Sequence, residues 1–420
     1  MSDLNTSKAA AELAVLPFYA VATLAFFVLS VLLFISADYM GGHYFQPKLL
    51  AVVHLAALGW ATMIIFGASY QLLPVICESP LFSSILAFAS FILLTIGVYL
   101  LVVSFWFFQT GWLMICGGTF VLLSTLCYLA NVLLTSQIFH QYSIQTLFMV
   151  SSALWLLFTV IVGLLLAVNL HQPFIERNHL DILKLHAHAG IAGWFLQLVT
   201  GVSIKLLPMF LLGRSQKERL LRYAFFLQNC GLLLFFADVF FTGFSSRALI
   251  WAALIAGGVI CHMLYLLDVF KHRLPKPLDY QMKHSFLSFL FLAITLLVIP
   301  IVVISDSGHW SILYGTLIFM GWLTAIILGK TYKTLPFIVW NKHYKNLTGK
   351  QKVPLPKHLY NETLVKLQFF IYIAAMMVLV AGILSAVSML VKAGFLLFIA
   401  VSLIYGYGVL SILFHKPKSS

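Results

Sequence analysis

The chain has few charged residues. They make up 9% of its 420 residues, whereas 62% are hydrophobic. A soluble domain carries roughly a quarter of charged residues, so this chain could not cover a globule with polar surface. Acidic residues are the scarcest, at 12 against 25 lysines and arginines. These shortages exclude a soluble enzyme or binding domain, and they predict that lipid surrounds most of the chain.

Cysteine is sparse as well. The five cysteines lie within or at the ends of apolar runs, and no two of them form a Cys-x-x-Cys pair. They therefore predict neither a disulfide framework nor a zinc site. The sequence also has no phosphate-binding loop, nucleophile elbow or paired-carboxylate site. Whether the protein is an enzyme stays open at this point.

Long apolar runs dominate what is present. A transmembrane helix needs about 20 mostly apolar residues to cross a hydrocarbon core roughly 30 Å thick. Twelve runs meet this length, and none shows the alternation of a barrel strand. The sequence therefore predicts an all-α polytopic membrane protein whose residues 1–420 form a single membrane domain. The expected spans are 15–37, 49–74, 82–104, 111–134, 144–168, 184–212, 222–242, 247–270, 284–304, 310–336, 366–390 and 393–414.

Lysine and arginine follow this topology and do not gather on a soluble domain. With the N-terminus in the cytoplasm, 20 of the 25 fall on the cytoplasmic side. This positive-inside pattern predicts both termini in the cytoplasm and a place in the inner membrane. The net charge of +13 therefore indicates contact with anionic lipid head groups, so the lipid bilayer is the expected partner and nucleic acid is not. The five lysines and arginines on the outer side are Lys48, Arg177, Lys184, Arg247 and Lys392.

One motif recurs every four spans. The second span reads HLAALGWATMIIFGASYQLLP from His54, the sixth reads HAGIAGWFLQLVTGVSIKLLP from His188, and the tenth reads TLIFMGWLTAIILGKTYKTLP from Thr316. The three copies match in their glycine, tryptophan, leucine and proline positions. This match at four-span spacing predicts three pseudo-symmetric four-helix repeats, approximately 1–138, 139–275 and 276–420. We expect the motif glycines to let helices approach closely, and the motif prolines to end each helix at the inner membrane edge.

Histidines are the candidate functional residues. Seven of the fourteen fall on the outer side, and His54 and His188 occupy equivalent positions of the motif. Imidazole inside a membrane is costly unless it is paired, and it is a common ligand of haem iron and copper. We therefore expect His54 and His188 to face one cavity and to bind haem or a metal. A single intramembrane histidine more often only hydrogen-bonds a neighbouring helix.

His186 is a second candidate ligand on the sixth span. It precedes His188 by two residues, so the two side chains point about 160° apart and cannot share one ligand position. We expect His188 rather than His186 to pair with His54. The loop histidines His43, His171, His179 and His309 are expected to be solvated, and His262 and His284 to pack between helices.

The histidine segments, LHAHAGIAGWF and the His54 motif, resemble the haem-copper oxidase subunit I superfamily. They are most similar to its small, stand-alone cytochrome oxidase subunit I-like members. The motif frame also resembles the second helix of NnrS, a twelve-span protein associated with haem, copper and nitric oxide stress. The resemblance implies a haem-binding protein, with copper as a further candidate cofactor and a respiratory-chain electron donor as a candidate partner.

The resemblance also implies a limit on function. In the family, the second and tenth helices supply the axial histidines of the low-spin haem, and His54 matches the first of them. The expected tenth span has no histidine, and the expected seventh span has none of the family's copper ligands. We therefore expect a role in electron transfer or in nitric oxide and respiratory stress, and no proton-pumping oxygen reduction.

Two other functions stay open. The bundle could form a transporter or channel in which His54 and His188 line a pore with Gln71, Lys205 and Lys333. Snorkelling to anionic lipid is a simpler explanation for the two lysines. Alternatively, the protein could be a cofactor-free accessory or assembly subunit.

Overall fold

The computed structural model describes residues 14–40, 42–136, 143–305 and 307–417. Within these residues the secondary structure is helical throughout, and twelve helices are long and apolar enough to cross a membrane. The all-α, twelve-span prediction is confirmed. Nine of the spans are single helices: α2 (Leu16–Ile35), α5 (Ser84–Trp106), α6 (Trp112–Ser136), α7 (Ile144–His171), α10 (Arg219–Thr242), α11 (Ala248–Lys271), α12 (Tyr280–Ile304), α15 (Glu362–Ser385) and α16 (Ser388–Leu413).

The other three spans are the ones that carry the recurring motif. Each consists of an α-helix, a π-helical segment and a second α-helix. In chain order they are α3 (Pro47–His54), η2 (Leu55–Thr62) and α4 (Met63–Cys77); α8 (His179–His188), η3 (Ala189–Leu196) and α9 (Gln197–Leu211); and α13 (Gly308–Thr316), η4 (Leu317–Leu323) and α14 (Thr324–Tyr344).

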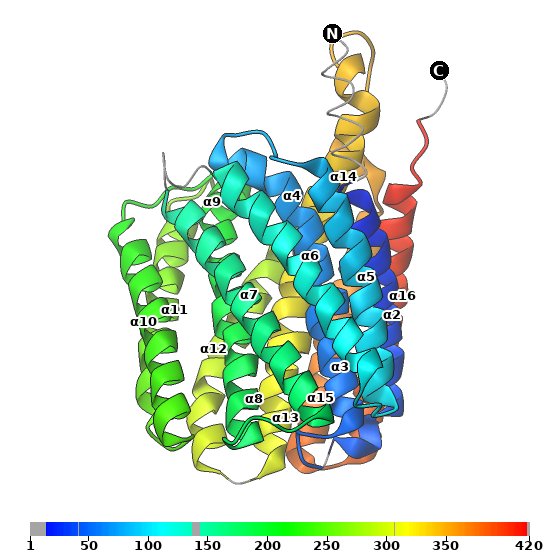
Figure 1. Ribbon diagram of the computed structural model, residues 1–420. Coiled ribbons are helices and arrows are strands. Elements are labelled where there is room, and N and C mark those ends of the chain that lie inside the picture. Colours follow the sequence, from blue (N-terminus) through cyan, green and yellow to red (C-terminus); the bar gives the residue numbers. More distant parts are fainter. Residues whose placement is uncertain (1–13, 41, 137–142, 306, 418–420) are drawn as a thin grey trace.

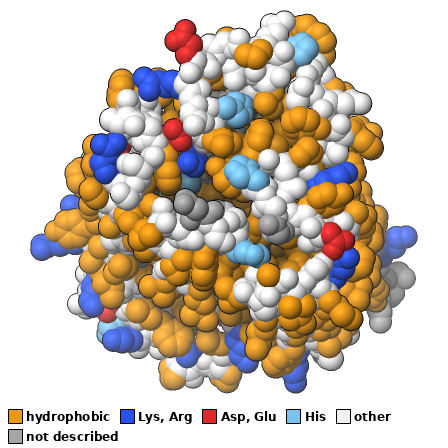
Figure 2. Space-filling view, turned by 90° about the horizontal axis from the view of Figure 1, so that it is seen from below, with side chains coloured by type: hydrophobic (Ala, Val, Ile, Leu, Met, Phe, Trp, Pro, Cys, Tyr) orange, Lys and Arg blue, Asp and Glu red, His pale blue; other side chains and the backbone are white. Residues whose placement is uncertain are grey.

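The helices run side by side in one bundle (Figure 1). The start of α2 and the end of α16 lie at the same end of the bundle, which we call the basic end and which the charge pattern predicts to be cytoplasmic. Figure 2 shows the opposite end, where several histidine side chains gather across the face. We call it the histidine end.

The π-helical segments mark the motif in the backbone. Each begins directly after the first motif position, which is His54, His188 or Thr316. A π-helical turn holds an extra residue and is frequent at functional sites. The three copies thus share one backbone feature in one register. This supports the internal repeat, while the rotation that relates the three four-helix units stays a prediction.

The motif tryptophans form a buried layer in which the copies contact one another. Trp60, Trp194 and Trp322 are each 1% exposed. The Trp60 indole donates to the Thr324 hydroxyl, and the Trp194 indole donates to the Thr62 hydroxyl, both at 3.1 Å. Each acceptor lies two residues after a tryptophan of another copy. The indole N–H of Trp322 has no partner among the described residues.

The motif glycines allow close helix packing, as predicted. A Cβ atom added at Gly67 would lie 2.7 Å from Phe18 Cβ, and one added at Gly201 would lie 2.6 Å from Phe148 Cβ. At Gly329 it would lie 2.5 Å from a backbone oxygen of α12. Any side chain at these positions would push the neighbouring helix away.

The motif prolines do not end their helices, which corrects that prediction. Pro74, Pro208 and Pro336 lie inside α4, α9 and α14. Each lies towards the end of its span, where water or neighbouring groups can satisfy the backbone carbonyl that proline leaves free.

The tenth span was expected to end at residue 336, but its helices continue to Leu347. The extension stands out from the basic end (Figure 1). Two contacts support it: the Trp340 indole donates to the Pro354 carbonyl at 2.6 Å, and Tyr344 Oη lies 2.8 Å from His415 Nε2.

Side-chain caps explain where two other spans begin earlier than expected. The sixth span was expected from residue 184 but begins at His179, because the Asn178 side chain accepts the N–H of Leu180. The eleventh was expected from residue 366 but begins at Glu362, where the Asn361 side chain accepts the N–H of Thr363. Such caps satisfy backbone donors that the first turn of a helix leaves free.

Candidate functional site

A cavity of about 1030 Å³ opens into the bundle at the histidine end. It is lined mainly by apolar side chains of helices from all three predicted repeats, and also by His54, His186 and His188. Ligand sites in proteins are mostly apolar hollows of roughly 300–1,000 Å³ with a few converging polar groups. The cavity is therefore at the upper end of that size range and has the expected composition.

His54 is held in one orientation and in one tautomer. Its Nδ1 lies 2.7 Å from the carbonyl oxygen of Leu50, one turn earlier on α3. Because a carbonyl can only accept, Nδ1 carries the proton and Nε2 keeps a free lone pair. The Phe105 ring stacks on the imidazole, with ring centroids 4.4 Å apart. A histidine fixed in this way is prepared to donate Nε2 to a metal.

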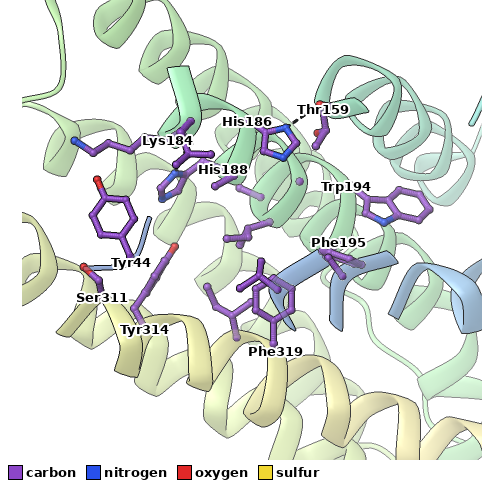
Figure 3. Close-up of a pocket in the computed structure, with 18 of the residues that line it drawn as sticks. Tyr44, Thr159, Lys184, His186, His188, Trp194, Phe195, Ser311, Tyr314 and Phe319 are labelled. Atoms are coloured by element: carbon purple, nitrogen blue, oxygen red, sulfur yellow. Dashed lines mark hydrogen bonds between the residues drawn. The ribbon is translucent and has the colours of Figure 1, made fainter. Parts of the chain in front are cut away.

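His186 is fixed in the same manner by a different helix. Its Nδ1 lies 2.9 Å from the carbonyl oxygen of Thr159 on α7, so its Nε2 is also unprotonated. Gly163 of α7 makes room for the ring, because a Cβ atom added there would lie 2.7 Å from His186 Cε1. Figure 3 shows His186 turned towards Thr159 at the side of the cavity.

The two fixed imidazoles form a pair. The ring centroids of His54 and His186 are 6.2 Å apart and the ring planes differ by 20°. Each metal–nitrogen bond is about 2 Å long, and each ring centre lies about 1 Å beyond its nitrogen. The centres of two imidazoles that bind one iron from opposite sides are therefore roughly 6 Å apart. The ring separation, the unprotonated Nε2 atoms and the apolar lining are thus compatible with a bis-histidine haem.

His188 lines the same cavity as His54, as expected, but the imidazole that lies beside His54 is that of His186. No contact joins the side chains of His188 and His54 in the part of the chain that the structure describes. His188 points to the other side of α8, where its ring centroid lies 5.2 Å from Phe235 and 6.2 Å from Tyr314. The divergence of His186 and His188 is as expected.

The other candidates lie away from the histidine pair. His43 lines the cavity mouth, whereas Gln71, Lys205 and Lys333 are not among the residues that line the cavity. Lys333 is paired with Asp279. His262 is buried beside Ser203, with its Nε2 2.8 Å from the hydroxyl, and His284 is also buried.

Of the loop histidines, His43, His171 and His309 are exposed, as expected, whereas His179 is half-buried. His171 Nδ1 lies 3.0 Å from the carbonyl oxygen of Thr110. His179 packs against Phe45, with ring centroids 5.5 Å apart. Within the described residues, no three His, Cys, Asp or Glu side chains gather into a metal-binding group. A haem needs only axial ligands from the protein, so this finding does not bear on the histidine pair.

The cavity has little charge. Lys184 is the only charged side chain among its described lining residues. Its ammonium lies 3.4 Å from an Asp181 oxygen and 3.8 Å from the centroid of the Phe244 ring. Tyr44 lies at the mouth, where burial, and secondarily the negative charge of Asp181, raises the pKa of its hydroxyl. Tyr44 therefore stays protonated near neutral pH.

Sequence reasoning missed two features of this site. It did not identify Gly163 or the Thr159 carbonyl, because nothing in a sequence indicates which helix will lie against His186. It also missed Tyr314, although a signal was present. Tyr314 precedes the first motif position of its copy by two residues, as His186 precedes His188.

No curated protein matches the chain. A family model described as cytochrome C and quinol oxidase polypeptide I matches residues 6–256, which is more than half of the chain. The matched region includes His54, His186 and His188. The chain therefore belongs to the cytochrome c and quinol oxidase subunit I family, the haem-copper oxidase superfamily that its histidine segments resemble.

Proposed function

We propose that this protein binds haem between His54 and His186 and acts in electron transfer or in the response to nitric oxide and respiratory stress. The observation that carries the proposal is the paired geometry: two nearly parallel imidazoles 6.2 Å apart, each with its Nδ1 engaged by a backbone carbonyl. A bound haem would supply reversible one-electron transfer.

The chain's own residues would prepare the site in three ways. The carbonyls of Leu50 and Thr159 hold the protons on Nδ1, so that both Nε2 atoms are directed to bind. Phe105 and Gly163 fix where the two rings lie. The apolar lining would favour a haem held by these two histidines alone over one that also binds water. Such a closed site suits electron transfer better than oxygen reduction.

The test is a visible absorption spectrum of protein produced with sufficient haem and purified in detergent. Wild type should show a low-spin haem signal, and both His54→Ala and His186→Ala should abolish it. His188→Ala should retain it, as should His171→Ala at the histidine end. Loss of the signal in His188→Ala with retention in His186→Ala would restore the pairing expected from the repeat.

A colourless wild-type protein would overturn the proposal. In that case the cavity would belong to a transporter or channel, or the protein would be a cofactor-free accessory subunit. Copper content, measured by elemental analysis of the same preparation, tests whether this second candidate cofactor is present.

The proposed location is the inner membrane, with the basic end in the cytoplasm. Reporter fusions after about residue 220 and after about residue 345 should report the cytoplasm, and fusions near residues 178 and 307 the outside. A cytoplasmic signal near residue 178 would reverse the orientation.

A further inference from the structure

A second, smaller hollow lies at the basic end of the bundle, far from the histidine pair. It has a volume of about 580 Å³ and is lined by Gln216, Lys217, Arg219, Leu220 and Leu264. The first four of these residues lead into and begin α10, and Leu264 lies about two turns before the end of α11. Both helices stand at the outer edge of the bundle (Figure 1). The hollow therefore opens where lipid head groups meet the protein.

The polar half of this hollow carries two positive charges. Lys217 and Arg219 are the charged residues among its described lining, and both are cations. The Arg219 side chain is exposed and has no hydrogen bond or ion pair among the described residues. The Lys217 ammonium lies 3.7 Å from an Asp268 oxygen, and its side chain is 58% exposed. Both cations are thus accessible to a ligand.

The carboxylate beside Lys217 is already engaged by other groups. One Asp268 oxygen accepts the hydrogen bond of the Ser215 hydroxyl at 2.7 Å, and the other lies 3.6 Å from His272 Nδ1. Asp268 therefore leaves Arg219 without an anionic partner. The start of α10 adds the partial positive charge of a helix N-terminus. A phosphate group in the hollow would be stabilised by both cations and by this helix start.

The other half of the hollow is apolar and continues into the outer surface of α11. Leu264 is 46% exposed, and Ile260 and Leu267, about one turn before and after it, are each 53% exposed. Residues spaced by three and four positions lie on one face of a helix. Their exposed apolar stripe leads away from the basic end into the membrane. A molecule that fills both halves has an anionic head and an apolar tail.

We propose that this hollow is a binding site for one anionic phospholipid. Its phosphate lies between the Lys217 ammonium and the Arg219 guanidinium, which can bind two phosphate oxygens at once. One acyl chain follows Leu264 along α11. A zwitterionic phospholipid fits less well, because its own ammonium group would lie beside Lys217 and Arg219 without a free carboxylate to pair with.

The test is native mass spectrometry of the full-length protein in detergent, with dioleoyl phosphatidylglycerol or dioleoyl phosphatidylcholine added. The two lipids have the same acyl chains and the same phosphate, and they differ in the charge of the head group. We expect the first phosphatidylglycerol to bind about tenfold more tightly than phosphatidylcholine. An excess of glycerol 3-phosphate, which has an anionic head and no chains, should not displace it. The readout does not involve haem, so it is independent of the proposed function.

Variants assign the binding to named residues. Lys217→Gln and Arg219→Gln should each weaken phosphatidylglycerol binding about fivefold, which is the contribution of one basic residue near an anionic lipid. The double variant should lose about 25-fold. Arg222→Gln combined with Lys271→Gln is the matched control. It removes two exposed cations of the same two helices that do not line the hollow, and it should leave the affinity unchanged.

Three results would overturn the proposal. Equal affinity for the two lipids would indicate a general site for acyl chains. An equal loss in the control variant would show that the whole basic end attracts the lipid and that the hollow does not select it. Displacement by glycerol 3-phosphate would indicate a phosphate site in which the chains have no part.

Discussion

The two ring pairs of the cavity differ in one side chain. In the first pair, His54 of one motif copy faces His186, which lies two residues before the motif start of the next copy. In the second pair, His188 faces Tyr314, which occupies that same offset in the third copy. Both pairs have ring centroids 6.2 Å apart and planes within 30° of parallel. The two pairs thus have similar ring geometry, and one residue decides whether the partner of the motif histidine is an imidazole or a phenol.

Tyr314→His should have the largest effect on this comparison. It makes the second pair a bis-histidine pair with the same ring separation, so we expect the haem bound per protein to rise from one towards two. Pyridine haemochrome absorbance against protein concentration measures the ratio. Tyr44→His at the cavity mouth is the control and should leave it at one. An unchanged ratio in Tyr314→His would show that the two pairs are not equivalent.

Gly163→Ala should weaken haem binding by the first pair and leave the second pair unchanged. The new Cβ atom would lie 2.7 Å from His186 Cε1, and overpacking of this kind costs about 1–3 kcal/mol. We expect haem affinity to fall about 5- to 150-fold, measured by haem titration of the apoprotein. Gly190→Ala is the matched control, since its Cβ atom would meet Thr159 at an ordinary 3.4 Å. Equal losses in the two variants would contradict the role given to Gly163.

The tryptophan layer offers a second comparison between copies. Thr62→Val removes the acceptor of the Trp194 indole and should lower the free energy of unfolding by about 1–3 kcal/mol, because a buried donor loses its partner. Leu196→Thr places a hydroxyl at the corresponding position of the second copy. It also removes a buried leucine, so the comparison is with Leu196→Val. Leu196→Thr should be the more stable of the two by up to about 1 kcal/mol, because the threonine hydroxyl accepts the unpartnered N–H of Trp322.

Denaturant titration in mild detergent measures both changes. A Leu196→Thr variant no more stable than Leu196→Val would show that the three copies do not pack in the same way at this layer.

The smallest expected effect lies outside the spans, at Asp38. The pKa of this carboxyl group is lowered mainly by Lys392 and to a smaller extent by the hydroxyl of Ser388. A carboxyl group whose pKa is lowered by folding stabilises the protein when the pH is above its pKa in the unfolded chain, about 3.9. That stabilisation is lost as the pH falls through its pKa in the folded protein. Asp38→Asn should therefore reduce the melting temperature slightly at pH 7 and not at pH 2–3. A reduction of the same size at both pH values would exclude an electrostatic cause.

The sequence was a good guide to regular features and a poor guide to neighbours. Apolar length predicted all twelve spans, and the motif spacing predicted the register in which the π-helical segments of the three copies appear. The same repeat did not indicate that His186, two positions before the motif, lies beside His54. Whether His54 and His188 bind one cofactor stays a prediction.

The sequence by itself determined that this is a membrane bundle, because its apolar runs cannot be hidden from water in any other way. It also determined which helices carry histidines and that His186 and His188 diverge, since both follow from helical periodicity. Only the tertiary structure decided that His186 meets His54, that Gly163 makes room for it, and that Tyr314 faces His188. These contacts join residues more than 20 positions, or about a whole repeat, apart in the chain, and helix packing alone sets them.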